Sequence, residues 1–233
     1  MKRLNGLSGG DSLSRIYVEN RALEYPRTKE ILERFKHSNI IEIDHYKNVF
    51  NRPRQDFVRQ KAFQNLILAV KDDSFLYEGP DICEDFGNDN FYYASAALNC
   101  IYDCHYCYLQ GMYQSANIVI FVNLEDFFVE ADERLNKLGS MYLSISYDTD
   151  LLALEGFLGY SRDWINFAKA RENLTIELRT KSANYGLISD IKPYANIILA
   201  FTLSPEEIIG KYEMYTAPLN KRIDAICRAL DDG

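Results

Sequence analysis

Apolar residues in this chain fall into short runs separated by amphipathic stretches, and the alternation becomes regular after residue 90. Short runs rich in β-branched or aromatic residues are typical of strands. They predict strands over 40–43, 75–77, 91–97, 117–122, 141–146, 174–180 and 196–203, and residues 66–70 form a further apolar run. Stretches with apolar residues on one helical face predict helices over 26–37, 56–65, 124–138, 161–172, 185–191 and 218–230.

Two capping signals mark the starts of predicted helices. Asn123 directly precedes the helix over 124–138 and is its expected N-cap. The segment Ser204-Pro205-Glu206-Glu207 predicts another helix start, because it offers Ser as N-cap, Pro at the first helical position and Glu in the first turn.

Strands that alternate with helices at this spacing predict βαβ units, a parallel sheet and an α/β fold. We expect a small α+β N-terminal region over residues 1–90, followed over residues 91–233 by a partial (β/α) barrel of about four βα units. Functional sites of such sheets lie at the carboxyl ends of the strands. A cysteine-rich segment follows the strand over 91–97 and therefore lies where a site is expected.

Composition and charge narrow the function classes. The chain has 233 residues, 47% of them hydrophobic, and a net charge of −8, which argues against a broad, non-specific nucleic-acid binder. No apolar run approaches the roughly 20 residues that span a bilayer. Residues 1–11 contain Lys2 and Arg3 but no apolar core, so we expect a cytoplasmic protein without a signal peptide or membrane contact.

Three of the five cysteines form a C-x3-C-x2-C motif at Cys100, Cys104 and Cys107. In the cytoplasm such clustering indicates metal binding or catalysis rather than disulfides. Three thiolates can hold a [4Fe–4S] cluster with one iron left open for a small molecule. The alternatives are a zinc site with His105 or Cys83 as fourth ligand, although the spacing is not a pair of C-x2-C knuckles, or three ordinary buried cysteines.

Several short motifs occur together in an order that resembles one family. They are Ala22-Leu23-Glu24-Tyr25-Pro26, Cys104-His105-Tyr106-Cys107-Tyr108-Leu109-Gln110, Val122-Asn123-Leu124, Arg179-Thr180-Lys181 and Pro218-Leu219-x-x-Arg222. The cysteine motif after the first regular strand resembles that of radical S-adenosylmethionine (SAM) enzymes, and the whole set resembles the spore photoproduct lyase family. The resemblance extends from Ile16 to the last residue and implies that the second region is a partial radical SAM barrel.

This resemblance implies an enzyme with two cofactors, a [4Fe–4S] cluster and SAM. In such enzymes SAM binds the open iron, and the reduced cluster cleaves it to a 5′-deoxyadenosyl radical that abstracts a hydrogen atom from the substrate. The implied substrate is a UV-induced thymine photoproduct, and the implied partners are UV-damaged DNA and an electron donor for the cluster. The alternative is a non-catalytic cluster- or zinc-binding remnant, or a partner subunit of a larger complex.

The resemblance also implies roles for individual side chains. Tyr106 and Tyr108 flank the last cysteine and are expected to touch SAM or relay a radical, with simple packing beside the cluster as the alternative. Lys181 is a candidate partner of the SAM carboxylate, and Thr202 is a candidate cofactor contact on the next strand. A solvated lysine and a plain strand threonine are the alternatives for these two residues.

One departure from the family concerns the hydrogen-atom donor. The family carries a cysteine just after the strand that follows the cluster segment, but residues 144–150 contain none. Tyr147 is the nearest residue that can donate a hydrogen atom and is our candidate catalytic residue, with a core or wall position as the alternative. Asp148 and Asp150 are either polar contacts or solvated loop residues, and we favour the second interpretation.

A second departure concerns length. After Cys107 the chain has about four βα units, whereas the family barrel has about six and then a DNA-contacting segment. We therefore expect an open sheet in which the strand over 196–203 has one unpaired edge. Apolar, uncharged edges recruit other strands, so a homodimer or a completing partner chain is expected there, with little DNA repair by this chain alone.

Overall fold

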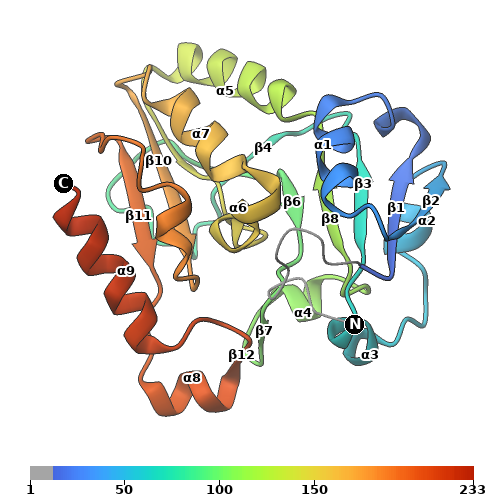
Figure 1. Ribbon diagram of the computed structural model, residues 1–233. Coiled ribbons are helices and arrows are strands. Elements are labelled where there is room, and N and C mark those ends of the chain that lie inside the picture. The colour runs from blue at the N-terminus through green and yellow to red at the C-terminus, as the bar shows by residue number, and fades with distance from the viewer. Residues whose placement is uncertain (1–12) are drawn as a thin grey trace.

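The computed structural model describes residues 13–233, so the expectation of no signal peptide in residues 1–11 lies outside the described residues. The first of two five-stranded sheets lies on the right of Figure 1 and has the order β2-β1-β3-β8-β6. Its strands are β1 (Arg15–Glu19), β2 (Asn39–Ile43), β3 (Leu66–Ala69), β6 (Ala97–Leu98) and β8 (Ile118–Phe121). All neighbours are parallel except β6, which is antiparallel to β8.

The second sheet has the order β11-β10-β9-β5-β4 and lies on the left of Figure 1. Its strands are β4 (Leu76–Glu78), β5 (Phe91–Ala94), β9 (Met141–Ser144), β10 (Leu174–Thr180) and β11 (Ile197–Phe201). Only β4 is antiparallel to its neighbour. β11 is an edge strand, because among the described residues it pairs with β10 alone.

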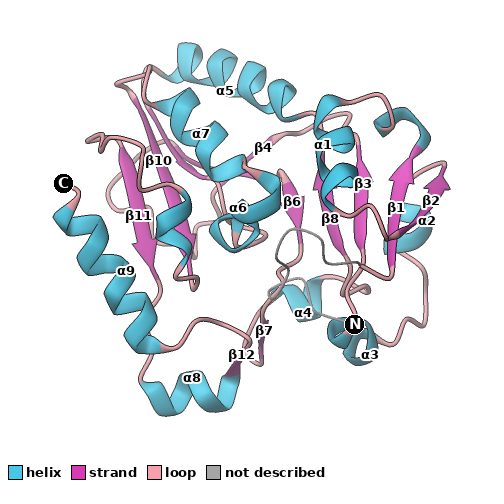
Figure 2. Ribbon diagram, in the orientation of Figure 1, coloured by secondary structure: helices cyan, strands magenta, loops and turns pink. Residues whose placement is uncertain are grey.

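Helices surround the two groups of strands, as Figure 2 shows in cyan. They are α1 (Pro26–Arg34), α2 (Lys47–Phe50), α3 (Phe57–Ala62), α4 (Leu109–Met112), α5 (Leu124–Leu138), α6 (Leu151–Leu158), α7 (Tyr160–Ala168), α8 (Glu206–Tyr212) and α9 (Leu219–Asp231), with 3-10 turns η2 (Asn20–Ala22) and η3 (Asn184–Leu187). A short pair, β7 (Asp103–Cys104) and β12 (Glu213–Met214), joins the cysteine loop to the C-terminal segment. None of the helices in residues 13–233 has the length and apolar content needed to cross a bilayer.

The predicted α/β class with parallel sheets is confirmed, and across residues 13–233 the sheets are open rather than closed into a barrel. The strand partners were not predictable, however. β8 pairs with β3 in the first sheet, although the sequence grouped residues 117–122 with the later strands. Both β3–β8 and β4–β5 pairs cross the expected boundary at residue 90, and the division into two regions stays a prediction.

The sequence pattern did not predict the short elements α2, α4, β7 and β12, nor two larger ones, α6 and β1. α6 has no clear amphipathic period to detect, because Leu151, Leu152 and Leu154 lie close together in its sequence and, like Leu158, are buried. β1 precedes the regular part of the pattern but is an interior strand of the first sheet, between β2 and β3.

Buried hydrogen bonds join the two sheets through the helices. The Tyr160 hydroxyl of α7 donates to the carbonyl of Phe121 at the end of β8, at 2.7 Å. Arg27 of α1 donates to the carbonyl of Leu158 at 2.9 Å and pairs with Asp163 of α7 at 2.5 Å. Because Tyr160 is fully buried, its bond fixes α7 of the second sheet against the first.

Of the two expected N-caps, Ser204 was wrong and Asn123 was right in position. α8 begins after Pro205 rather than Ser204, and the Ser204 hydroxyl instead donates to Glu213 at 2.8 Å. Asn123 occupies the N-cap position of α5 but makes no side-chain cap bond. Its amide instead accepts from the N–H of Lys71 at 2.9 Å and donates to the Lys71 carbonyl at 2.8 Å, so it bridges the first sheet to α5.

This assignment predicts different effects for two substitutions of Asn123. Asn123→Ala leaves the N–H and C=O of Lys71 unpaired and should lower the free energy of unfolding by about 1–3 kcal/mol. Asn123→Ser should not recover this loss, because serine is a good N-cap but is too short to make both bonds. Urea unfolding of both variants measures the difference. If Asn123→Ser were as stable as the wild type, Asn123 would act as an N-cap rather than through its bonds to Lys71.

Candidate functional site: a cysteine-lined pocket at the strand ends

A pocket of about 280 Å³ lies where β9, β10 and β11 end, next to the cysteine loop. All eight side chains singled out from the sequence line it: Cys100, Cys104, Tyr106, Cys107, Tyr108, Tyr147, Lys181 and Thr202. It is also lined by Tyr102, Leu109, Ser146, Thr149, Asp150, Arg179 and Thr180. Segments more than 100 residues apart in sequence therefore converge on one cavity, as expected for parallel strands.

The cysteine loop is held by main-chain contacts and by burial. Lys61 and Gln64, from α3 and the turn after it, donate to the carbonyl of Cys100 at 2.6 and 2.9 Å. The N–H of Tyr102 lies 3.4 Å from the Cys100 sulfur and donates to it. Burial raises the pKa of the Cys100 thiol to about 12, against the opposing charge of Lys61, and that of Cys104 to about 11. Both thiols are therefore protonated at neutral pH unless a metal centre displaces the protons.

The donor set fits an iron–sulfur cluster. The structure brings three soft thiol ligands from one eight-residue loop to the same pocket, which is the ligand chemistry such clusters use. Among residues 13–233, no three His, Cys, Asp or Glu side chains lie close enough together to hold a single metal ion. Neither expected fourth zinc ligand lines the pocket, because the His105 ring packs against Tyr212 and Cys83 lies beside Tyr147.

A buried network ties Tyr106 to the C-terminal segment. The Tyr106 hydroxyl donates to Glu213, whose other carboxylate oxygen pairs with Arg222 at 2.6 Å. The Glu213 and Arg222 side chains have no exposed surface. Although burial alone would raise it, the pKa of Glu213 is lowered by the bonds from Tyr106, Arg222 and Ser204. The ionised carboxylate thus locks β12 and α9 against the cysteine loop.

Tyr108 and Tyr147 lie together on another wall of the pocket. The Tyr108 hydroxyl donates to the carbonyl of Tyr147 at 2.8 Å, and the ring centroids are 5.9 Å apart. Tyr147 also stacks on Tyr93 at 4.1 Å, and its hydroxyl lies 3.4 Å from the sulfur of Cys83. Burial raises the pKa of both Tyr108 and Tyr147, so both phenols carry their hydrogen at neutral pH.

The interpretation of Asp148 and Asp150 as solvated loop residues was wrong, because both are buried. Asp150 caps α6 by accepting from the N–H of Ala153 at 3.0 Å, and it accepts from the Lys181 N–H at 2.7 Å and the Thr180 hydroxyl at 2.8 Å. Burial raises the pKa of Asp150, and these bonds oppose the shift. Asp150 therefore fixes the end of β10 from which the Lys181 side chain emerges.

Lys181 and Thr202 occupy adjacent strand ends. The Lys181 ammonium lies 5.4 Å from the centre of the Tyr106 ring, within cation–π range. The N–H of Thr202 donates to the Thr180 carbonyl at 2.8 Å, and its own carbonyl accepts from Arg222 at 2.8 Å. Main-chain hydrogen bonds thus hold Thr202 in place, and the contact with the Tyr106 ring holds the Lys181 ammonium. Both residues line the cavity.

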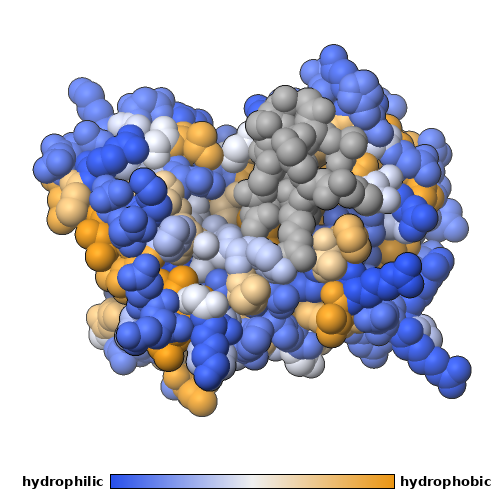
Figure 3. Space-filling model, turned by 60° about the horizontal axis from the view of Figure 1, so that its bottom comes forward, coloured by the Kyte–Doolittle hydropathy of each residue, from blue (hydrophilic) through white to orange (hydrophobic). Residues whose placement is uncertain are grey.

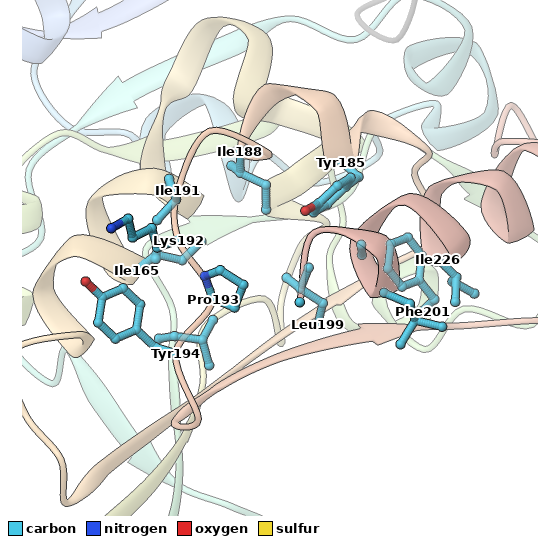
Figure 4. Close-up of a pocket in the computed structure, with 14 residues that line it drawn as sticks. Ile165, Tyr185, Ile188, Ile191, Lys192, Pro193, Tyr194, Leu199, Phe201 and Ile226 are labelled. Atoms are coloured by element: carbon cyan, nitrogen blue, oxygen red, sulfur yellow. The ribbon is translucent and has the colours of Figure 1, made fainter.

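A second cavity, of about 310 Å³, is separate from the cysteine loop. It lies between α9, β11 and the segment after η3, and Figure 4 shows Ile188, Leu199, Phe201 and Ile226 pointing into it. Its lining is mostly apolar, with Lys192 and the Tyr185 and Tyr194 hydroxyls as its polar groups among those labelled in Figure 4. This cavity offers packing surface rather than reactive groups.

The open parallel sheets and the C-x3-C-x2-C loop at their carboxyl ends define a radical SAM protein. The sequence profile described as spore photoproduct lyase matches residues 12–233. This chain therefore belongs to the spore photoproduct lyase family.

Individual relatives agree with this assignment. The chain is 24% identical over 225 residues to spore photoproduct lyase of Bacillus subtilis (strain 168), and 24% identical over 227 residues to that of Geobacillus sp. (strain Y412MC61). Each match covers 94% of this chain and 64% of the relative. A solved structure of spore photoproduct lyase with dinucleoside spore photoproduct matches with a TM-score of 0.81 at 21% identity, covering 95% of this chain and 65% of that one. The chain therefore spans just under two thirds of these proteins.

Sequence reasoning missed two residues that organise the pocket. Asp150 precedes the apolar run Leu151-Leu152-Ala153, which is an N-cap signal that could have been recognised. Glu213 carries no local signal, because its partners Arg222 and Tyr106 are 9 and 107 residues away. Only a three-dimensional structure reveals that pairing.

Replacing Arg222 should show how much the Glu213–Arg222 ion pair contributes to stability. Arg222→Met leaves the Glu213 carboxylate buried beside an apolar side chain and should lower the free energy of unfolding by about 3–5 kcal/mol at pH 7. The loss should shrink as the pH falls from 7 to 5, because without arginine the pKa of Glu213 rises and protonation removes the uncompensated charge.

The matched control is the double variant Glu213→Gln with Arg222→Met, which carries no buried charge at this position. It should be more stable than Arg222→Met alone at pH 7, with a smaller dependence on pH. Urea unfolding at both pH values measures these differences. If Arg222→Met lost the same unfolding free energy at pH 7 and pH 5, the assignment of Glu213 as a buried, ionised partner of Arg222 would be contradicted.

Proposed function

We propose that this chain binds a [4Fe–4S] cluster on Cys100, Cys104 and Cys107 and SAM in the adjoining pocket, and acts as a radical SAM enzyme on a UV-induced thymine photoproduct in DNA. One observation carries the proposal: the three cysteines and every predicted SAM or radical contact line a single pocket at the ends of parallel strands. Membership of the spore photoproduct lyase family supports it.

When bound, the reduced cluster and SAM would supply a 5′-deoxyadenosyl radical that abstracts a hydrogen atom from the substrate. The protein's own part is to hold and orient these groups. Lys181 offers its ammonium to the SAM carboxylate, and Thr202 and Tyr106 supply the neighbouring walls. Tyr108 and Tyr147 stay protonated and so keep hydrogen atoms available beside the pocket.

The substrate class is supported by the relatives of known structure. One solved spore photoproduct lyase contains dinucleoside spore photoproduct, and a variant of it contains both AdoMet and that dinucleoside, with a TM-score of 0.79 to this chain. Photoproduct-containing DNA is the macromolecular partner that this chemistry requires. An electron donor must also reach the cluster, and we place the protein in the cytoplasm, where reduced thiols and such donors coexist.

The edge of β11 is where we propose a second chain to dock, either another copy or a completing partner. β11 bears no charge in its sequence and pairs on one side only among the described residues. Figure 3 shows apolar side chains gathered on the side where α8, α9 and β11 lie, and exposed apolar residues there include Ile198, Leu203, Ile208, Ile223 and Leu230. An edge of this composition favours strand pairing.

A non-catalytic cluster-binding subunit is the second candidate function. The observation behind it is that residues 144–150 contain no cysteine, where the family places its hydrogen-atom donor. Formation of 5′-deoxyadenosine from SAM under reducing, anaerobic conditions distinguishes the two candidates, because a subunit without catalysis would produce none.

Anaerobic reconstitution with iron and sulfide should give a brown protein with about four irons per chain. Replacing Cys100, Cys104 or Cys107 by alanine should abolish the colour in each case, because each thiolate holds a different iron. The control Cys227→Ala, at an exposed position on α9, should bind iron like the wild type. Iron analysis and absorption spectra provide the measurement, and a colourless protein with one tightly bound zinc would overturn the cluster.

Lys181→Ala should weaken SAM binding about 10- to 150-fold, since a hydrogen bond to a charged group contributes about 1.5–3 kcal/mol. Equilibrium binding of SAM to the reconstituted protein measures the effect. Lys192→Ala serves as the matched control, because Lys192 lines the second cavity and should leave SAM affinity unchanged. Equal affinities in the two variants would remove Lys181 from the SAM site.

A further inference from the structure

A buried cation lies beside the cysteine loop, outside the pocket itself. Lys61 of α3 is only 7% exposed, although lysine side chains are seldom buried without an ion partner. Its ammonium donates to the carbonyl of Cys100 at 2.6 Å and, within residues 13–233, has no carboxylate at ion-pair distance. Burying a cation in this way is unfavourable unless opposite charge lies nearby.

α3 holds Lys61 in a fixed position next to the loop. The helix begins after Asp56, whose carboxylate caps it by accepting a hydrogen bond from a main-chain N–H in the first turn. Gln60 precedes Lys61 and accepts from the N–H of Ala116 at 2.9 Å, in the segment between α4 and β8. These contacts fix α3 against the segment that follows the cysteine loop, so the Lys61 side chain reaches Cys100 from an anchored helix.

The charge of Lys61 acts on the three cysteines. Burial lowers the pKa of the Lys61 ammonium, and nearby negative groups oppose that shift, namely Cys100, Asp103, Cys107 and Cys104. In return, the charge of Lys61 opposes the rise that burial causes in the pKa of the Cys100 thiol. The cysteines, in their thiolate form, are thus among the groups that compensate this buried charge.

A clamp on the Cys100 carbonyl does not by itself require a charge. Gln64 donates to the same oxygen at 2.9 Å through a neutral amide, and it also donates to the carbonyl of Ala116 at 2.7 Å. A neutral donor at position 61 would avoid the free-energy cost of burying a cation. The charge of Lys61 therefore needs an explanation beyond the hydrogen bond.

We propose that the charge of Lys61 raises the reduction potential of a [4Fe–4S] cluster bound to Cys100, Cys104 and Cys107. The inference rests on the proposed function. Three thiolates give the oxidised cluster a negative charge, and the electron that reduces it adds another. A fixed ammonium favours the more negative form, and burial keeps solvent and salt from screening the interaction. Net charge around a cluster is one of the factors that set its potential.

The test is a redox titration of reconstituted protein at pH 7, without SAM or substrate, followed by electron paramagnetic resonance of the reduced cluster. Lys61→Gln keeps a donor but removes the charge. It should shift the one-electron equilibrium at least tenfold toward the oxidised cluster, which corresponds to a midpoint potential lower by about 59 mV or more. Lys61→Arg keeps the charge and should stay within about twofold of the wild-type equilibrium.

Gln64→Leu is the matched control, because it removes a neutral donor to the same carbonyl. It should shift the equilibrium less than about threefold, since it leaves the charge in place. Equal shifts in Lys61→Gln and Gln64→Leu would assign the effect to the hydrogen bond and overturn the inference. So would a wild-type potential in Lys61→Gln, or a shift in Lys61→Arg as large as that in Lys61→Gln.

Iron content separates this inference from the proposed function. A wild type that holds no iron–sulfur cluster after reconstitution would overturn the proposed function itself. If Lys61→Gln held too little cluster to titrate, Lys61→Arg would decide, because it should keep about four irons per chain and the wild-type potential. Loss of iron from Lys61→Arg to the same extent as from Lys61→Gln would show that the charge is not what matters and would overturn the inference.

Discussion

The buried ion pair of Glu213 and Arg222 is the interaction that holds the C-terminal segment against the cysteine loop, and the arrangement of the pocket depends on it. It has no exposed surface, and its carboxylate also receives the hydroxyl of Tyr106 from the cysteine loop. Arg222 in turn donates to the carbonyls of Thr202 and Ala217, so one guanidinium connects the end of β11, the start of α9 and β12. A buried pair of this kind is favourable only when its polar atoms are satisfied, and here main-chain carbonyls and the hydroxyls of Tyr106, Ser204 and Thr216 supply the remaining bonds.

Asp150 has a similar role at the end of β10. A carboxylate with burial of this degree would be unfavourable alone, but it receives two main-chain N–H groups and one hydroxyl. The result is that the N-terminus of α6 and the end of β10 are held at one point. The Glu213 carboxylate thus positions Tyr106, and the Asp150 carboxylate positions Lys181. Both act on the site through these neighbours, without contact to a cofactor.

Sequence alone predicted those parts of the fold in which local pattern and tertiary packing agree. α5 over Leu124–Leu138 and β10 over Leu174–Thr180 have the predicted bounds. α5 has a clear amphipathic period, and β10 alternates apolar and polar residues with the period of a strand. α6 was missed because its closely spaced leucines give no clear amphipathic period. The partner of β8 was missed because an apolar strand carries no information about which neighbour it pairs with.

For the site, sequence predicted which residues converge but not the contacts that hold them. The cysteine motif and the strand-end residues are local signals, and the fold brings them to one pocket. The contact of Cys83 with Tyr147 joins a loop after β4 to a loop after β9, and no spacing rule relates the two. Contacts of this kind depend on how the sheet places two strand-end loops side by side, so only the folded chain reveals them. The same limit applies to Glu213, whose partners Tyr106 and Arg222 come from distant segments.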